Sequence, residues 1–133
     1  DEQEQALDEY GRNLGVAFQL VDDALDYDAT TEELGKNIGD DLAEGKPTLP
    51  LIYAMDHGTA AERHMIREAI ETGGIQNLTS IQLAIETSGG LCYTAERAQD
   101  EAELAVKALQ GLPDSDYKKA LASLAHFAVN RRF

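Results

Sequence analysis

The sequence predicts an all-α fold with at least five helices and no sheet. Apolar residues recur at steps of three and four through most of the chain, which is the period of an amphipathic helix. No stretch alternates apolar and polar residues with β-branched or aromatic enrichment over more than a few positions, as a strand would. Short glycine-containing breaks separate the helical stretches, and such breaks are typical of antiparallel neighbours in a bundle.

The first expected helix covers residues 2–27 and is the longest. Residues 35–47 hold glycines and Pro47 among charged residues, which indicates a loop or a broken short helix. Pro50 fits the first turn of the helix that follows, because the N–H it lacks would have no partner there. Further helices are expected over residues 48–58, 60–72, 77–87, 91–109 and 115–130.

Composition and charge restrict the function classes. The chain has 133 residues, 43% of them hydrophobic, which is sufficient for one domain with a buried core. The formal net charge of −14 would repel nucleic acid and anionic membrane surfaces, so neither is expected as a partner. The single cysteine, Cys92, cannot form an intrachain disulfide, is expected to be a small packing residue, and fits a cytoplasmic location. No apolar run approaches the roughly 20 residues that span a bilayer, so we expect a soluble protein.

Three aspartates near the end of the first expected helix share one stripe. At about 100° per residue, Asp22, Asp23 and Asp26 fall within an arc of about 100° around Gln19, and apolar residues occupy the rest of the circumference. Solvated faces usually carry a cation three or four positions from an acid, and these aspartates have none there. We therefore expect the acids to face a solvent-reachable cavity or groove. Spacing alone leaves two interpretations open: an ordinary acidic face, or a site for Mg²⁺, which takes carboxylate and phosphate oxygens.

Two lysines flank an acidic pair in the glycine-rich segment that follows. Lys36 and Lys46 enclose Asp40 and Asp41 within the string GKNIGDDLAEGKPTLP. A lysine is a point charge suited to a diphosphate. Alternatively, the two lysines only balance Asp40, Asp41 and Glu44 on a surface loop. Beside a metal stripe the first interpretation is favoured, because metal, diphosphate and lysine are complementary parts of one site.

The string FQLVDDALDY, followed by GKNIGDDLAEGKPTLPL, resembles the second aspartate-rich region of the trans-isoprenyl diphosphate synthases. The strings SGGLCYTAERAQDEA and LASLAHFAVNRRF look like the long-chain polyprenyl branch of that family. The resemblance implies a bundle of mostly antiparallel helices around a central cavity, with two aspartate-rich motifs facing each other across it. Residues 1–133 contain only the second motif, so they are expected to be the C-terminal part of a single synthase domain whose N-terminal half is absent.

The same resemblance implies a set of metal ligands. Asp22 matches the first aspartate of the motif and is expected to bind Mg²⁺ directly. Asp23 and Asp26 are expected to act through metal-bound water. Asp40 matches an acid that lies close to the metal site in the family. The three aspartates of the stripe, together with Lys36, are the expected catalytic residues.

Substrate contacts are implied in the same way. Gln19 and Lys36 match positions that contact the allylic diphosphate, and Lys46 matches a second, more peripheral lysine. Phe18 matches an aromatic residue near the homoallylic substrate, although its periodicity would equally place it in the core. The residues that would set product length belong to the half that is absent, so product length cannot be predicted from this sequence.

The implied activity is a prenyl transfer, in which an allylic diphosphate is elongated head to tail with isopentenyl diphosphate and loses diphosphate. Mg²⁺, both diphosphates, the N-terminal half of the same protein and a second copy in a homodimer are the expected partners. The alternative from a different class is a non-catalytic helical subunit or interaction module of a heteromeric prenyl synthase. A terpene cyclase is disfavoured, because such enzymes usually carry a mixed Asn, Ser and Glu motif at this position. Catalysis is not expected of the three isolated histidines, His57, His64 and His126.

Overall fold

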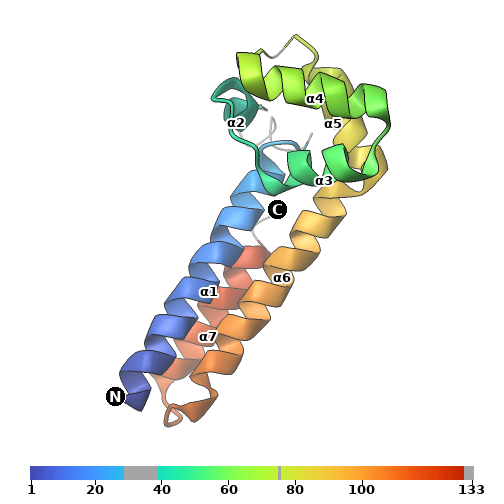
Figure 1. Cartoon of the computed structure of the whole chain (residues 1–133). Helices are drawn as coiled ribbons and strands as arrows, with labels where there is room; N and C mark the ends of the chain where they lie inside the picture. The colour runs from blue at the N-terminus through green and yellow to red at the C-terminus, as the bar shows by residue number, and fades with distance from the viewer. Residues whose placement is uncertain (29–38, 75, 131–133) are drawn as a thin grey trace. The chain divides into compact units, whose positions relative to one another are not determined.

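The computed structural model describes residues 1–28, 39–74 and 76–130. Within these ranges the chain is helical and contains no strand, which confirms the predicted all-α class (Figure 1). The observed bounds lie within about two residues of the expected ones, which is the usual uncertainty of a helix end. The elements are α1 (Glu2–Leu25), α2 (Asp40–Ala43), α3 (Leu49–His57), α4 (Ala60–Thr72), α5 (Leu78–Ser88), α6 (Gly90–Ala108), the 3-10 helix η2 (Leu109–Gly111) and α7 (Asp116–Val129).

Side-chain caps explain where several of these helices begin. At the start of α4, Thr59 Oγ1 accepts a hydrogen bond from Glu62 N at 3.1 Å, and Thr59 N donates to Glu62 Oε1 at 2.8 Å. This reciprocal capping box satisfies two N–H groups that have no partner within the helix. Ser115 caps α7 by accepting from Lys118 N at 3.1 Å. Both caps are local in sequence, which is why the positions of these helix starts are well predicted.

The chain forms two compact units, and the first comprises residues 1–21 and 95–133. In it, the early part of α1 runs beside α6 and α7 (Figure 1). Tyr10 is buried at the centre of this unit and donates a hydrogen bond from its hydroxyl to the Leu121 carbonyl at 2.7 Å. Burial raises the pKa of Tyr10 above its ordinary value of 10. The buried cluster around it consists of Tyr10, Ala105, Leu109 and Ala125.

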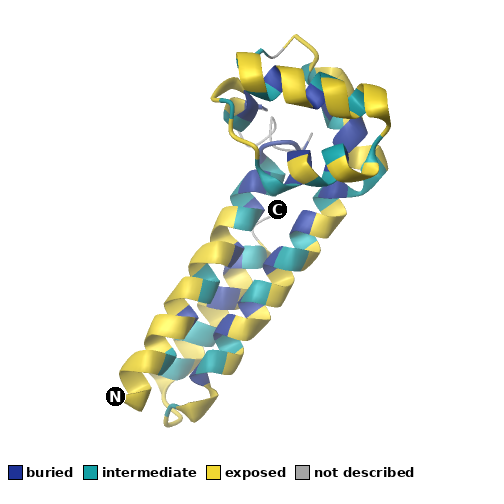
Figure 2. Cartoon of the chain, viewed as in Figure 1, coloured by how far each residue is buried: buried dark blue, intermediate teal, exposed yellow. Residues whose placement is uncertain are grey.

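The second unit comprises residues 22–94 and contains a separate core. Helices α3, α4 and α5 contact one another, and α2 contacts α4. Figure 2 shows the inward faces of these helices as buried and their outward faces as exposed. Tyr27, directly after α1, is fully buried in this core. The cluster consists of Tyr27, Leu42, Leu51, Ala54, Ile66, Ala69, Ile81 and Ile85.

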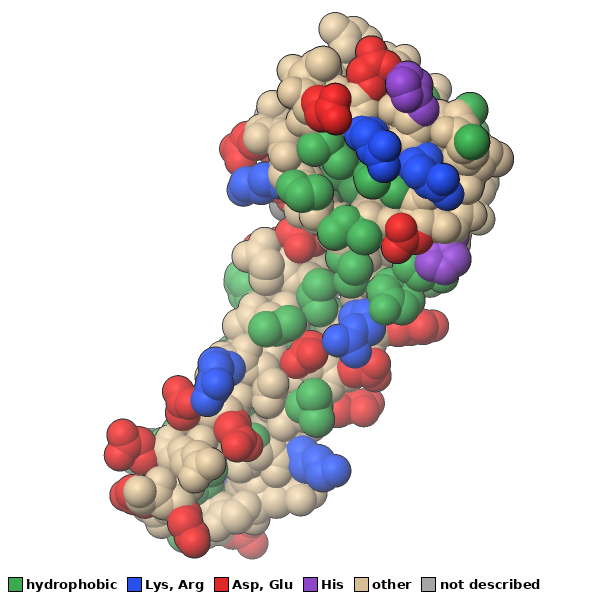
Figure 3. Space-filling model, in the orientation of Figure 1, with side chains coloured by type: hydrophobic (Ala, Val, Ile, Leu, Met, Phe, Trp, Pro, Cys, Tyr) green, Lys and Arg blue, Asp and Glu red, His purple; other side chains and the backbone are tan. Residues whose placement is uncertain are grey.

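Large apolar side chains remain exposed in the first unit. They lie on all three of its long helices and include Leu7, Val16, Phe18, Leu104, Leu124 and Phe127. Figure 3 shows apolar side chains on the visible face among acidic and basic ones. These positions do not make a membrane span, since none of the helices in the described ranges is long and apolar enough to cross a bilayer.

The expectation that Cys92 is a packing residue is wrong, because its side chain is exposed. The reason lies in the register of α6. The buried positions of this helix recur at steps of three and four, through Thr94, Ala98, Ala102 and Ala105. Cys92 lies two residues before Thr94, and two residues correspond to about 200° on a helix. Its side chain therefore points away from the buried face.

Candidate functional site

The aspartates of the stripe lie at the C-terminal end of α1, and they differ in burial. Asp22 is half-buried, whereas Asp23 is 8% exposed and Asp26 only 1% exposed. The expectation that all three face a solvent-reachable groove is therefore wrong for Asp23 and Asp26. Asp26 N still donates the helical hydrogen bond to the Asp22 carbonyl at 3.1 Å, and the Asp26 carboxylate is covered by the start of α2, where Asp41 N donates to Oδ2 at 3.1 Å.

Two other residues of the expected site, Phe18 and Gln19, precede the aspartates on α1. Both belong to the part of α1 that groups with the first unit, and both are exposed. Phe18 is 46% exposed, which disfavours the interpretation that its periodicity only reflects core packing. Their contacts with substrate stay predictions.

Asp26 holds the N-terminal end of α2 through two hydrogen bonds. Its backbone carbonyl accepts from Gly39 N at 3.0 Å, and its side-chain Oδ2 accepts from Asp41 N at 3.1 Å. The first N–H groups of a helix have no partner inside it and usually bond to the side chain of the N-cap residue. The N-cap of α2 is Gly39, which has no side chain. Asp26 therefore supplies, from another segment, the acceptor that the N-cap lacks.

Gly39 is required at this position for two reasons. Its φ of +84° lies in the left-handed region, which other residues seldom adopt. A Cβ added there would come within 2.8 Å of Leu78 Cδ1. The backbone of Gly39 thus packs directly on a side chain of α5, while its N–H joins the start of α2 to the Asp26 carbonyl.

Tyr27 fixes the same turn from the core side. Its ring is fully buried, and its backbone carbonyl accepts a hydrogen bond from Gln82 Nε2 at 3.1 Å. Burial raises the pKa of Tyr27, and the charges of Asp26 and Asp41 raise it further. Tyr27 ends the motif string FQLVDDALDY, but no task was expected of it, and Gln82 was not expected in this region. An aromatic residue directly after the acidic stripe was the available signal for Tyr27, whereas no local pattern identifies Gln82, 55 residues away in the sequence.

Lys46 lies among acidic side chains, as expected if it balances the charges of a surface loop. Its Nζ is 3.0 Å from Glu44 Oε2 and 3.7 Å from Asp41 Oδ1. The hydrogen bond and charge of Glu44, followed by the charge of Asp41, raise the pKa of Lys46. Lys36, the other lysine expected to contact diphosphate, lies outside the described residues. Asp40 is described and exposed.

The carboxylates suit a metal site that other ligands complete. No group of three or more His, Cys, Asp or Glu side chains in residues 1–28, 39–74 and 76–130 is placed to hold a metal ion. Asp22 offers a partly exposed carboxylate at the end of α1. Mg²⁺ keeps several waters and is typically held by one or two carboxylates together with substrate phosphates. The residues present therefore fit Mg²⁺ as part of a shared site and do not form a closed cage.

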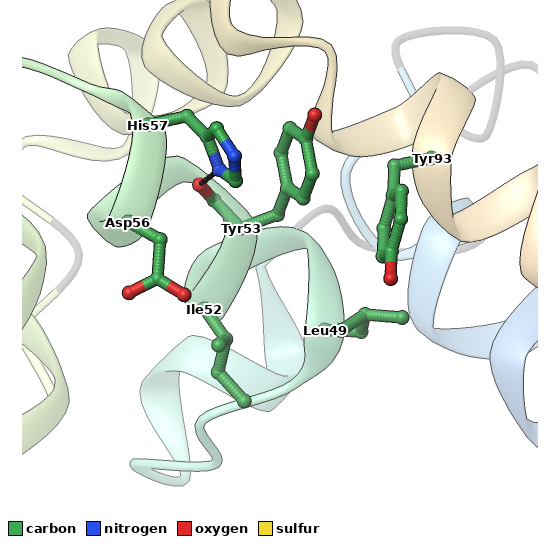
Figure 4. Close-up of a pocket in the computed structure, with 6 residues that line it drawn as sticks. All are labelled: Leu49, Ile52, Tyr53, Asp56, His57 and Tyr93. Atoms are coloured by element: carbon green, nitrogen blue, oxygen red, sulfur yellow. Dashed lines mark hydrogen bonds between the residues drawn. The ribbon is translucent and has the colours of Figure 1, made fainter.

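A separate hollow in the second unit is lined by stacked rings (Figure 4). Tyr53 and His57 of α3 stack with their ring centroids 3.9 Å apart, and Tyr53 stacks on Tyr93 of α6 at 4.5 Å. His57 Nδ1 lies 3.1 Å from the Tyr53 backbone oxygen. The remaining lining residues are Leu49, Ile52 and Asp56. The rings pack on one another, and none of the expected metal-binding or substrate-binding residues lines this hollow.

Comparison with known proteins identifies relatives that all belong to one family of enzymes. A family model described as polyprenyl synthetase matches residues 1–87. Octaprenyl diphosphate synthases from Haemophilus influenzae and Escherichia coli are 58% and 55% identical to the chain, over 98% of its length in each case. The chain spans 40% of the length of the first relative and 41% of the second.

Solved structures agree with this result. Polyprenyl synthase from Caulobacter crescentus, crystallised with calcium and isoprenyl diphosphate, superposes with a TM-score of 0.88 at 44% identity. It covers 99% of this chain, which corresponds to 41% of that protein. Decaprenyl diphosphate synthase from Rhodobacter capsulatus also gives a TM-score of 0.88, at 40% identity, over 98% of this chain and 41% of its own. The predicted helical fold is therefore confirmed.

Proposed function

Because the chain belongs to the polyprenyl synthetase family, we propose that it forms the C-terminal part of a magnesium-dependent polyprenyl diphosphate synthase. This enzyme elongates an allylic diphosphate with isopentenyl diphosphate, head to tail, and releases diphosphate and a proton. The observation that carries the proposal is the end of α1, where Asp22 keeps partial access to solvent while Asp26 and Tyr27 fix the backbone that follows. A firmly held and partly exposed carboxylate suits a metal that also binds substrate phosphates.

The proposed enzyme needs partners that complete the site. Since the chain spans about 40% of its relatives, the first aspartate-rich motif and the residues that bind isopentenyl diphosphate are assigned to an N-terminal part. The relative from Caulobacter crescentus was crystallised with calcium and isoprenyl diphosphate, which supports a site for a divalent cation and a diphosphate. A cytoplasmic homodimer is part of the proposal.

The side chains of this part have distinct tasks in the proposed reaction. Asp22 gives a carboxylate oxygen to the metal, whereas Asp23, which is buried, acts through bound water. When bound, Mg²⁺ neutralises the negative charge that builds on a departing diphosphate. Gln19 orients the allylic diphosphate through its amide, and Phe18 contacts the homoallylic substrate.

The lysines add positive charge beside the diphosphate. Lys46 exchanges its contacts with Glu44 and Asp41 for diphosphate oxygens. This exchange costs little, because exposed ion pairs contribute little to stability. The same role is proposed for Lys36, which matches a family position that contacts the allylic diphosphate, and fixed positive charge there would stabilise the transition state.

Asp22→Ala in the full-length protein tests the proposal. We expect turnover to fall by about two to three orders of magnitude, as when other preorganised groups of an active site are removed. Folding should stay intact, because the substitution removes a charge from a run of like charges. Asp56→Asn, which removes an exposed acid from the end of α3, is the control and should keep turnover.

Two outcomes would contradict the proposal in different ways. Wild-type turnover in both Asp22→Ala and Asp22→Asn would show that the stripe does not bind the catalytic metal. A folded full-length protein that does not condense the two diphosphates in the presence of Mg²⁺ would instead favour the alternative, a non-catalytic subunit of a heteromeric synthase.

A further inference from the structure

We infer that Asp26 is a positioning residue that fixes α2 and, through α2, the ammonium group of Lys46, and that it is not a metal ligand. This inference rests on the proposed function, since it assigns a task within the same site. It replaces the expectation that Asp26, as a member of the stripe, acts on the metal through bound water.

Access to solvent separates Asp26 from Asp22. Asp26 is 1% exposed, so a metal arriving with its hydration shell has no path to its carboxylate unless the turn opens. A buried carboxylate is costly unless hydrogen bonds compensate for the lost water. The Asp41 N–H provides such a bond to Oδ2 at 3.1 Å, and a donor on a peptide backbone cannot be removed by a change of side chain.

The connection from Asp26 to Lys46 passes through Asp41. Oδ2 of Asp26 holds the Asp41 backbone, and Lys46 N donates a hydrogen bond to the Asp41 carbonyl at 2.9 Å. The Lys46 ammonium also lies 3.7 Å from the Asp41 carboxylate. Lys46 is therefore tied to Asp41 through its backbone, and this bond remains when the ammonium group leaves the Asp41 carboxylate for the diphosphate. A shift of Asp41 moves the backbone from which the Lys46 ammonium group is proposed to reach the diphosphate.

The comparison of Asp26→Asn with Asp26→Ala tests the inference. The amide oxygen of asparagine accepts the Asp41 N–H but is a poor ligand for Mg²⁺, whereas alanine does neither. In the full-length enzyme, Asp26→Ala should raise the KM for the allylic diphosphate about tenfold, which corresponds to one hydrogen bond to a charged group, and change kcat less. Asp26→Asn should keep KM, kcat and the Mg²⁺ concentration for half-maximal rate within about threefold of the wild type.

Amide hydrogen exchange gives a readout that does not need activity. Exchange in residues 39–43 should become faster in Asp26→Ala and stay near the wild-type rate in Asp26→Asn. If Asp26→Ala does not fold, Asp26→Ser takes its place, because its shorter side chain cannot reach the Asp41 N–H and stays polar. Asp22→Asn is the matched control: it should lose activity without a change in the exchange of residues 39–43.

The outcomes distinguish the inference from the proposed function. An Asp26→Asn enzyme that loses activity as Asp26→Ala does and needs more Mg²⁺ would overturn the inference, because it would show a metal ligand. Faster exchange with an unchanged KM would also overturn it, since the bond would then be only structural. If the wild-type enzyme does not transfer prenyl groups, the proposed function fails, while the exchange of residues 39–43 still shows whether Asp26 holds α2.

Discussion

Gly39→Ala should destabilise the protein by about 1–2 kcal/mol. An L-residue in the left-handed region costs about that much relative to glycine, and Gly39 has a φ of +84°. The added Cβ would lie 2.8 Å from Leu78 Cδ1, so Leu78 must shift. This shift adds little, because Leu78 is only half-buried and Cδ1 is the free end of its side chain. The backbone conformation therefore decides the magnitude.

Urea unfolding of the full-length protein, followed by circular dichroism, measures this difference. Gly11→Ala is the matched control, because Gly11 lies within α1 and an added Cβ would meet nothing within 4 Å. It should stabilise the protein by about 0.5–1 kcal/mol, the usual gain from alanine in a helix interior. The reasoning about φ and the Leu78 contact would be refuted if Gly39→Ala were as stable as the wild type. It would also be refuted if Gly39→Ala raised the free energy of unfolding and Gly11→Ala lowered it.

The remaining predictions concern the first unit and the isolated chain. Tyr10→Phe should lower stability by about 1 kcal/mol at neutral pH, because it removes the 2.7 Å hydrogen bond to the Leu121 carbonyl. Since burial raises the pKa of Tyr10, the wild type should lose stability as pH rises above 10, and unfolding at pH 8 and 11 should show a smaller loss in Tyr10→Phe. Residues 1–133 alone should be inactive, should bind Mg²⁺ and diphosphate weakly and should self-associate in analytical ultracentrifugation, because Leu124 and Phe127 among others are exposed. Product formation by this chain at ordinary enzymatic rates would contradict that expectation.

The helices could be predicted from the sequence because their signals are local. Pro50 lies in the first turn of α3, and the capping pair Thr59 and Glu62 marks the start of α4. Each signal lies within a few residues of the helix start that it marks. The exposure of Cys92 was missed because its burial was predicted from residue type alone. The steps of three and four between Thr94, Ala98 and Ala102 define the buried face of α6, and Cys92 lies outside it.

The sequence names candidate site residues but does not indicate their burial. The spacing of Asp22, Asp23 and Asp26 places them on one helix face, provided that the helix continues through all three positions. Spacing does not show which of the three a neighbouring segment covers, and the structure buries Asp23 and Asp26 while Asp22 stays partly exposed. The bond to Asp41 spans 15 residues, and no pattern in the sequence indicates which distant N–H group a carboxylate will meet.

The bond between Asp26 and Asp41 joins two segments that the core already holds. Each of these aspartates is followed directly by a fully buried apolar side chain, Tyr27 after Asp26 and Leu42 after Asp41. Burial of the two side chains supplies most of the free energy that brings the segments together, about 1.5–3 kcal/mol for a side chain such as leucine. Apolar contacts have little directional preference, so they leave the rotation of α2 only loosely defined. A hydrogen bond of fixed length and direction selects one rotation. Apolar burial thus holds the two segments together, and the hydrogen bond sets the rotation of α2. Loss of the Asp26 carboxylate should therefore alter the position of Lys46 more than the stability of the fold.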